Sequence, residues 1–176
     1  MTERVMIIGV GNILFTDEGF GVRVVERIQN RYTFPETVSV VDGGVLGLNL
    51  LGVISEADHL IAVDAIRYGG APGDLHRLSG DQIPERIRAK NSLHQIDFLE
   101  ALAMCAALDH TPKTVIVGVE PEDMETLNLS LTPTAEAQID PVIGMVLAEL
   151  DRLGVTYQEK GADDHVSGDP VENRGD

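Results

Sequence analysis

The stretch that decides the fold is Gly9-Val10-Gly11-Asn12-Ile13-Leu14-Phe15-Thr16-Asp17-Glu18-Gly19. It follows the apolar run 5–8, which predicts a buried β-strand. After it come Gly21, Val24, Val25 and Ile28, spaced like one face of a helix. A strand, a glycine turn and acids at a helix start place carboxylates at the carboxyl edge of a sheet, where α/β proteins carry their chemistry.

Strand-like and helix-like segments alternate along the rest of the chain. We expect strands at 4–10, 37–42, 59–64, 74–78 and 113–119, and helices at 18–31, 46–57, 94–108 and 134–153. The best strands are unbroken aliphatic runs, which indicates burial on both faces. We therefore predict a three-layer α/β/α sandwich with a twisted, mostly parallel sheet of about five strands, in which 74–78 is an antiparallel edge strand.

The end of the chain raises two separate points. Pro141 lies inside the last helical pattern, so that helix either begins at Pro141 with Asp140 as its N-cap or is kinked there. After Tyr157 the sequence is polar and has few apolar residues to bury, so we expect one domain over 1–157 and a disordered acidic tail over 158–176.

Composition narrows the class of protein. The chain has 176 residues and a net charge of -16, which argues against nucleic acid because phosphate backbones need clustered Lys and Arg. The single cysteine, Cys105, cannot form an internal disulfide and lies in an apolar helical pattern, where packing is its expected role. No apolar run reaches membrane-spanning length and no signal peptide is visible, so we expect a cytoplasmic protein with no membrane partner. We expect a monomer, because no clear exposed apolar stripe is left unassigned in the sequence.

Three residues far apart in sequence are expected to meet at the carboxyl edge of the sheet. Glu18 follows the first strand, Asp64 ends the strand 59–64, and His94 opens the helix 94–108 behind a capping box of Ser92 and Gln95. The helix dipole at that position keeps the imidazole neutral, as a metal ligand must be. Two carboxylates and one imidazole suit an open site for a divalent transition metal such as nickel or zinc.

Other interpretations of these residues remain open. The helix dipole favours Glu18 without any ligand, Asp64 can cap a turn, and His94 can be an ordinary partly buried histidine. The rival function is dinucleotide binding, because Gly9 and Gly11 begin its fingerprint. However, Leu14 stands where the third glycine should be, and acids at the helix start would repel a pyrophosphate. His59 and His76 are poorer ligand candidates, since His76 is expected to point outward from an edge strand.

At these residues the chain resembles a known family, the maturation endopeptidases of nickel-iron hydrogenases, over most of 4–153. The opening motif 9–19 is similar, and so are Asp42-Gly43-Gly44, Val63-Asp64-Ala65 and Ser92-Leu93-His94-Gln95. Pro72-Gly73 with His76-Arg77-Leu78, Pro121-Glu122 and the stretch 131–141 follow in the family's order. Any one of these motifs is weak, but so many in order make the resemblance specific.

The resemblance implies a function and a set of site residues. Members of the family cut a C-terminal extension from the hydrogenase large-subunit precursor after nickel has been inserted. The family's metal-contacting and catalytic residues correspond to Glu18, Asp64 and His94, and its precursor-recognising loop corresponds to Asp42, Gly43 and Gly44. The nickel would be carried by the precursor, and other divalent metals can occupy the site in the free protein. The alternative within this class is a metal-dependent assembly partner that binds the precursor without cutting it.

The chain departs from the family pattern in one region. Glu120 stands where relatives commonly carry Gln, and Thr126 and Asn128 lie in a loop that is often rich in glycine. These positions lie away from the three ligand candidates in sequence. They therefore affect the choice of precursor rather than the expected activity.

Overall fold

Five strands form the central sheet, in the order β3-β1-β4-β6-β5. The computed structural model describes residues 3–44, 49–80, 82–83 and 111–161. The strands span Val5–Val10 (β1), Val38–Gly44 (β3), His59–Ala65 (β4), Leu75–Ser79 (β5) and Lys113–Val119 (β6). All neighbours are parallel except β5, which runs antiparallel to β6 at the edge, so the predicted sheet and its antiparallel edge strand are confirmed.

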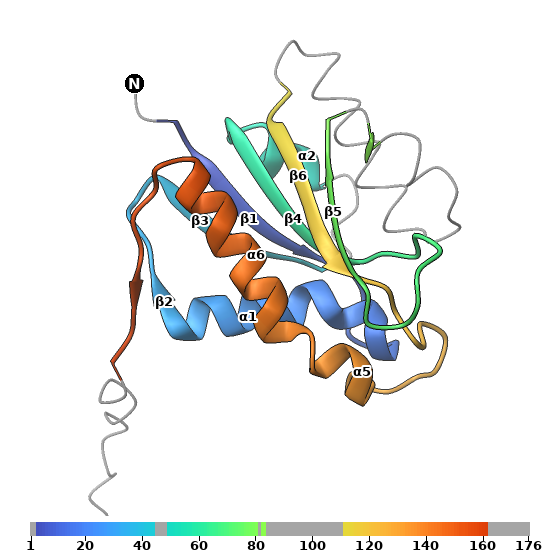
Figure 1. Cartoon of the computed structure of the whole chain (residues 1–176). Helices are drawn as coiled ribbons and strands as arrows, with labels where there is room; N and C mark the ends of the chain where they lie inside the picture. The colour runs from blue at the N-terminus through green and yellow to red at the C-terminus, as the bar shows by residue number, and fades with distance from the viewer. Residues whose placement is uncertain (1–2, 45–48, 81, 84–110, 162–176) are drawn as a thin grey trace, which may run out of the picture.

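Helices cover both faces of this sheet (Figure 1). A 3-10 turn, η1 (Thr16–Gly19), leads into α1 (Phe20–Arg31), and α1 shares one face with α6 (Ile139–Arg152). The short helix α2 (Asn49–Ile54) lies on the other face. The predicted three-layer arrangement is thus present in the described part of the chain, while the predicted helix 94–108, with Cys105, lies outside it.

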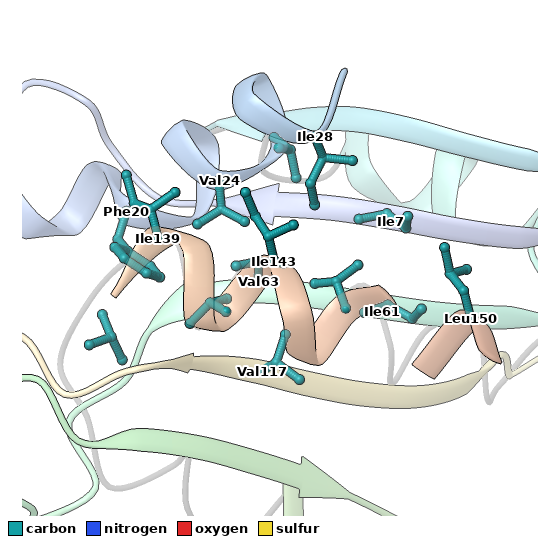
Figure 2. Packing of buried hydrophobic residues seen from close by; sticks show 14 of the residues in the cluster. Ile7, Phe20, Val24, Ile28, Ile61, Val63, Val117, Ile139, Ile143 and Leu150 are labelled. Carbon is teal, nitrogen blue, oxygen red and sulfur yellow. The ribbon is translucent and has the colours of Figure 1, made fainter. Parts of the chain in front are cut away.

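The side chains of β1 alternate between two cores, because successive residues of a strand point to opposite faces. Val5 and Ile7 pack with α1 and α6, whereas Met6 and Ile8 pack with Ile54 of α2. Figure 2 shows the first core, where aliphatic side chains of α1 and α6 meet those of three strands. The predicted aliphatic interior follows from these unbroken strands, since every residue of β1 and of β4 is buried.

The last helix does not begin at Pro141, so the first of the two sequence interpretations of this region is wrong. A short helix, α5 (Pro133–Glu136), comes first, with the Thr132 side chain accepting a hydrogen bond from the Ala135 N–H at its start. The main helix then begins at Ile139, two residues before Pro141. Proline is tolerated there because the N–H groups of a first turn have no partner within their own helix.

The predicted boundary of the ordered domain at Tyr157 also needs correction. Gln158–Glu159 form a short strand, β7, which pairs antiparallel with β2 (Tyr32–Thr33) directly after α1. Lys160 continues this contact, since its N–H donates to the Arg31 carbonyl at 2.8 Å. Backbone pairing with a distant segment needs no apolar side chain, which is why composition could not reveal it. The predicted tail after Gly161 lies outside the described residues.

None of the helices in the described ranges has the length and apolar character needed to cross a membrane.

Candidate active site

The order of the strands creates a switch point at the carboxyl end of β1. From β1 the chain passes through α1 to β3 on one side, and later returns through α2 to β4 on the other side. The connections to β3 and to β4 thus lie on opposite sides of β1, which leaves a crevice at the carboxyl end of β1. Ligands of α/β proteins bind in a crevice of this kind. The motif 9–19 starts at this place.

Gly11 lies where three of the predicted segments meet. A β-carbon on Gly11 would lie 1.8 Å from the Glu18 carbonyl oxygen and 3.9 Å from Asp64 Oδ1. Its N–H donates to the Gly44 carbonyl at 3.2 Å. With a φ of +130°, its backbone has a conformation that side chains other than glycine rarely adopt. The glycine therefore permits the close approach of Glu18, Asp64 and the Asp42-Gly43-Gly44 loop.

Glu18 is held at this rim by the backbone of its own turn. The Asn12 N–H donates to the Glu18 carbonyl at 3.1 Å, and the Glu18 N–H donates to the Phe15 carbonyl at 2.9 Å. Asp64, near the end of β4, is 7% exposed, and its Oδ1 accepts a hydrogen bond from the Ala65 N–H at 2.8 Å. The turn η1 contacts β4, so the structure brings these two predicted ligands to one edge of the sheet.

The third predicted ligand, His94, lies outside the described residues. Within the described ranges, no three side chains of His, Cys, Asp or Glu form a group that could hold a metal ion. The Asp64 carboxylate and the backbone of Glu18 lie at this rim next to a glycine turn, and two carboxylates gathered there would suit part of a divalent metal site. The joint placement of all three residues stays a prediction.

Asp17 has a role that the sequence did not reveal. Its side chain is fully buried, and its carboxylate accepts hydrogen bonds from the backbone N–H groups of Glu122, Asp123 and Thr132 at 2.9, 3.1 and 2.8 Å. The Thr132 hydroxyl donates to it as well, at 2.9 Å. One carboxylate thus fastens the turn that carries Glu18 to the 120–132 segment. Only the sequence position of Asp17, next to Glu18 in the motif, hinted at importance.

His76 does not point outward, as the sequence analysis expected, because a buried acid binds it. Its Nε2 lies 2.9 Å from Glu120 Oε2, and the two side chains are 10% and 8% exposed. The same Glu120 oxygen accepts the N–H groups of Tyr68 and Gly70 at 2.7 and 3.2 Å. In the sheet His76 pairs with Gly118, which has no side chain to occupy the space beside it. Glu120 therefore anchors the loop that follows the Asp64 strand.

The fold and this rim define the class of the protein: an α/β domain with two acids gathered around a glycine at its switch point. Comparison with known proteins then gives the family. The family model described as "Hydrogenase maturation protease" (HycI) matches residues 22–149. The chain belongs to this family, as the resemblance in the sequence indicated.

Individual relatives agree with this assignment. The chain is 42% identical over 162 residues to the hydrogenase expression/formation protein HupD of Bradyrhizobium diazoefficiens, a match that covers 91% of this chain and 84% of that protein. It is also 42% identical to the hydrogenase 2 maturation protease of Escherichia coli, with 86% and 93% covered. The solved structure of the hydrogenase maturating endopeptidase HybD from E. coli superposes with a TM-score of 0.85 at 41% identity, covering 89% of this chain and 98% of that one.

Proposed function

We propose that this protease removes the C-terminal extension from the nickel-loaded precursor of a nickel-iron hydrogenase large subunit. The observation that carries the proposal is that the Glu18 backbone and the Asp64 carboxylate both lie next to Gly11, at the switch point of a chain that belongs to the maturation proteases. The acids Asp17 and Glu18, in the turn η1 that leads into α1, also disfavour a dinucleotide, since its pyrophosphate would lie against them.

In this proposal the metal belongs to the substrate. Glu18, Asp64 and His94 bind the nickel ion that the precursor carries, and the Asp42-Gly43-Gly44 loop contacts the precursor beside it. The Gly44 carbonyl accepts a hydrogen bond from the Gly11 N–H, and the Asp42-Gly43-Gly44 loop therefore lies at the same rim as both acids. A bound divalent ion can polarise a carbonyl or lower the pKa of a water molecule. A carboxylate at this rim, Glu18 or Asp64, can in addition accept a proton from an attacking water.

We further infer that the protein acts in the cytoplasm as a monomer, without nucleic acid or membrane, and that other divalent metals can occupy the site when no precursor is present. The net charge of -16 supports the exclusion of nucleic acid. Nickel in the precursor would then serve as the signal that insertion is complete.

The first prediction concerns the three proposed ligands. Glu18→Gln, Asp64→Asn and His94→Ala each abolish cutting of nickel-loaded precursor, because each removes one metal donor. Mass spectrometry of the purified precursor after incubation measures the loss of the C-terminal extension. Circular dichroism checks that each variant keeps the wild-type fold.

Two outcomes would contradict the proposal. If all three variants process the precursor at the wild-type rate, the site assignment is wrong. If the wild-type protein binds nickel-loaded precursor but never shortens it, the protein is an assembly partner and not its protease. If the protein cuts metal-free precursor efficiently, the proposed cleavage activity stands, but nickel is not the signal that triggers it.

A further inference from the structure

Three leucines are strongly exposed on the side of the molecule that carries the rim. Leu14, Leu127 and Leu129 are 51%, 73% and 59% exposed, and we call them the leucine patch. Leu75 and Leu153, the other exposed large hydrophobic residues within the described ranges, are 38% and 36% exposed. Exposed apolar side chains that lie together are typical of an interaction surface, whereas single scattered ones are not.

Backbone pairing brings the members of the patch together. Phe15 pairs in parallel with Asn128, the Asn128 N–H donates to the Leu14 carbonyl at 3.0 Å, and the Thr16 N–H donates to the Asn128 carbonyl at 2.9 Å. Leu14 and Leu127 each come directly before a residue of this pair, and Leu129 comes directly after Asn128. The pairing therefore brings the three leucines to one small region of the surface.

The patch is held in place by buried polar contacts. Asp17 binds both ends of the 122–132 segment, and the Thr16 hydroxyl donates to the Thr126 carbonyl at 2.7 Å. Thr16 adopts a φ of +43°, an unfavourable conformation that surrounding contacts must maintain. The Asp123 carboxylate accepts the N–H groups of Glu125 and Thr126. A surface fixed in this way loses little conformational entropy when a partner binds.

Position and charge indicate what covers the patch. Leu14 lies four residues before Glu18 on the same turn, so a molecule that reaches Glu18 must pass close to the patch. Around it the exposed side chains of Glu122 and Glu125 are acidic, in a chain of net charge -16. Next to Leu129 the surface is hollowed by a cleft of about 450 Å³ between α1 and α5. Arg23 and Arg27 in its lining are each paired with an acid, Glu26 and Glu136, so the unbalanced charge near the patch is that of Glu122 and Glu125. This surface fits an apolar protein segment with basic neighbours.

We propose that the leucine patch is the docking surface for the hydrogenase large-subunit precursor, which presents an apolar segment flanked by basic residues to it. The inference rests on the proposed function and extends it. The rim with Glu18 and Asp64 carries out cleavage, and the patch supplies affinity for the folded precursor. Because the patch takes no part in the cleavage step, loss of docking by the patch raises KM and leaves kcat unchanged.

The test is the double variant Leu127→Ser/Leu129→Ser, assayed with nickel-loaded precursor over a range of concentrations. We expect KM to rise about 100-fold, about tenfold for each leucine, with kcat within about twofold of wild type. Leu153→Ser, an exposed leucine that directly follows α6, is the matched control and leaves both constants unchanged. Leu127→Met/Leu129→Met, which keeps the apolar character, restores a KM near that of wild type.

The outcomes separate this inference from the proposed function. If the wild-type protein does not cut the precursor, the proposed function fails. If it cuts and the serine variant has a wild-type KM, or loses kcat at unchanged KM, the patch is not the docking surface. A wild-type dimer that dissociates in the serine variant while KM stays constant would show that a second copy of this chain covers the patch, and would overturn the inference too. Thermal unfolding checks that the serine variant is folded.

Discussion

At the scale of single residues, Asp17 links the candidate site to a distant part of the chain. It is separated by 105 and 115 positions from its partners Glu122 and Thr132, so no local pattern could predict their contact. Glu18 and Asp64 were predictable, in contrast, because each follows or ends an apolar strand whose carboxyl edge is a known place for chemistry. The structure brings Glu18 and Asp64 to one edge of the sheet, whereas their role as metal donors and the position of His94 stay predictions.

Asp17→Asn should destabilise the protein, because an amide offers one acceptor atom to several N–H and O–H donors and turns its own N–H₂ toward some of them. We expect the free energy of unfolding to fall by about 2 kcal/mol in urea titrations. Asp140→Asn is the control, since its carboxylate is 69% exposed and paired with Arg31 on the surface, and it should cost less than about 1 kcal/mol. Equal losses for the two variants would contradict a special role for Asp17.

At the scale of elements, α1 lies against the sheet at a glycine. A β-carbon on Gly21 would lie 2.1 Å from the Val63 carbonyl oxygen and 2.5 Å from that of Val10. Gly21→Ala should therefore push the helix away from β1 and β4 and cost about 3 kcal/mol of stability. The effect is measured by chemical denaturation.

Gly144 in α6 is the matched control for Gly21. It is exposed and a β-carbon there meets no atom within 4 Å, so Gly144→Ala should raise stability by about 0.5 to 1 kcal/mol through helix propensity. If both alanine variants changed stability in the same direction, packing against the sheet would not explain the requirement at Gly21.

An ion pair joins the edge strand β5 to α6. Arg77 donates to both carboxylate oxygens of Glu149, at 2.6 and 3.2 Å, and Arg152 binds the same carboxylate. The hydrogen bond from Arg77, followed by that from Arg152, holds the pKa of Glu149 below its ordinary value of 4.5 despite the opposing effect of burial. A group with a lowered pKa in the folded state stabilises the protein above its unfolded pKa, and this contribution is lost as the pH falls through the folded value.

We therefore expect the wild-type protein to be more stable than Glu149→Gln at neutral pH, and this difference to shrink as the pH falls below about 4.5. Urea unfolding of both proteins between about pH 6 and pH 3 measures the difference. A difference that stays constant over this range would mean that Glu149 does not contribute through its charge.

Elements set by a local pattern of apolar residues could be predicted from the sequence, whereas features set by contacts with other segments could not. The strands β1 and β4 and the helix α1 have strong local patterns of apolar residues, and all three were predicted. The start of α6 depends on the short helix α5 before it, which Thr132 caps, so the position of Pro141 alone was misleading. The burial of His76 depends on Glu120, an acid on a different strand end.

At the scale of the whole molecule, the net charge of -16 gives an electrostatic field that attracts a basic partner. We expect the KM for precursor to rise by about threefold between roughly 0.05 and 0.3 M salt, while kcat changes little, because salt screens charges on the surface. Steady-state kinetics at several salt concentrations measures both constants.

Variants of surface acids locate this effect. Glu122→Gln/Glu125→Gln, beside the leucine patch, should flatten the salt dependence, and Glu159→Gln in β7 should not. If the three proteins had the same salt dependence, the attraction would come from the total charge and not from the acids near the patch.

The ribbon of β2 and β7 has a practical consequence. It follows α1, whose 12 residues span about 18 Å and run away from the rim with Glu18. In Figure 1 this ribbon lies far from the turn that opens α1. An affinity tag or sensor-chip linker joined directly after Gly161 would therefore begin its path at the end of α1 that lies away from this rim. Immobilising the protein in this orientation would leave the cleavage edge free for a large incoming substrate.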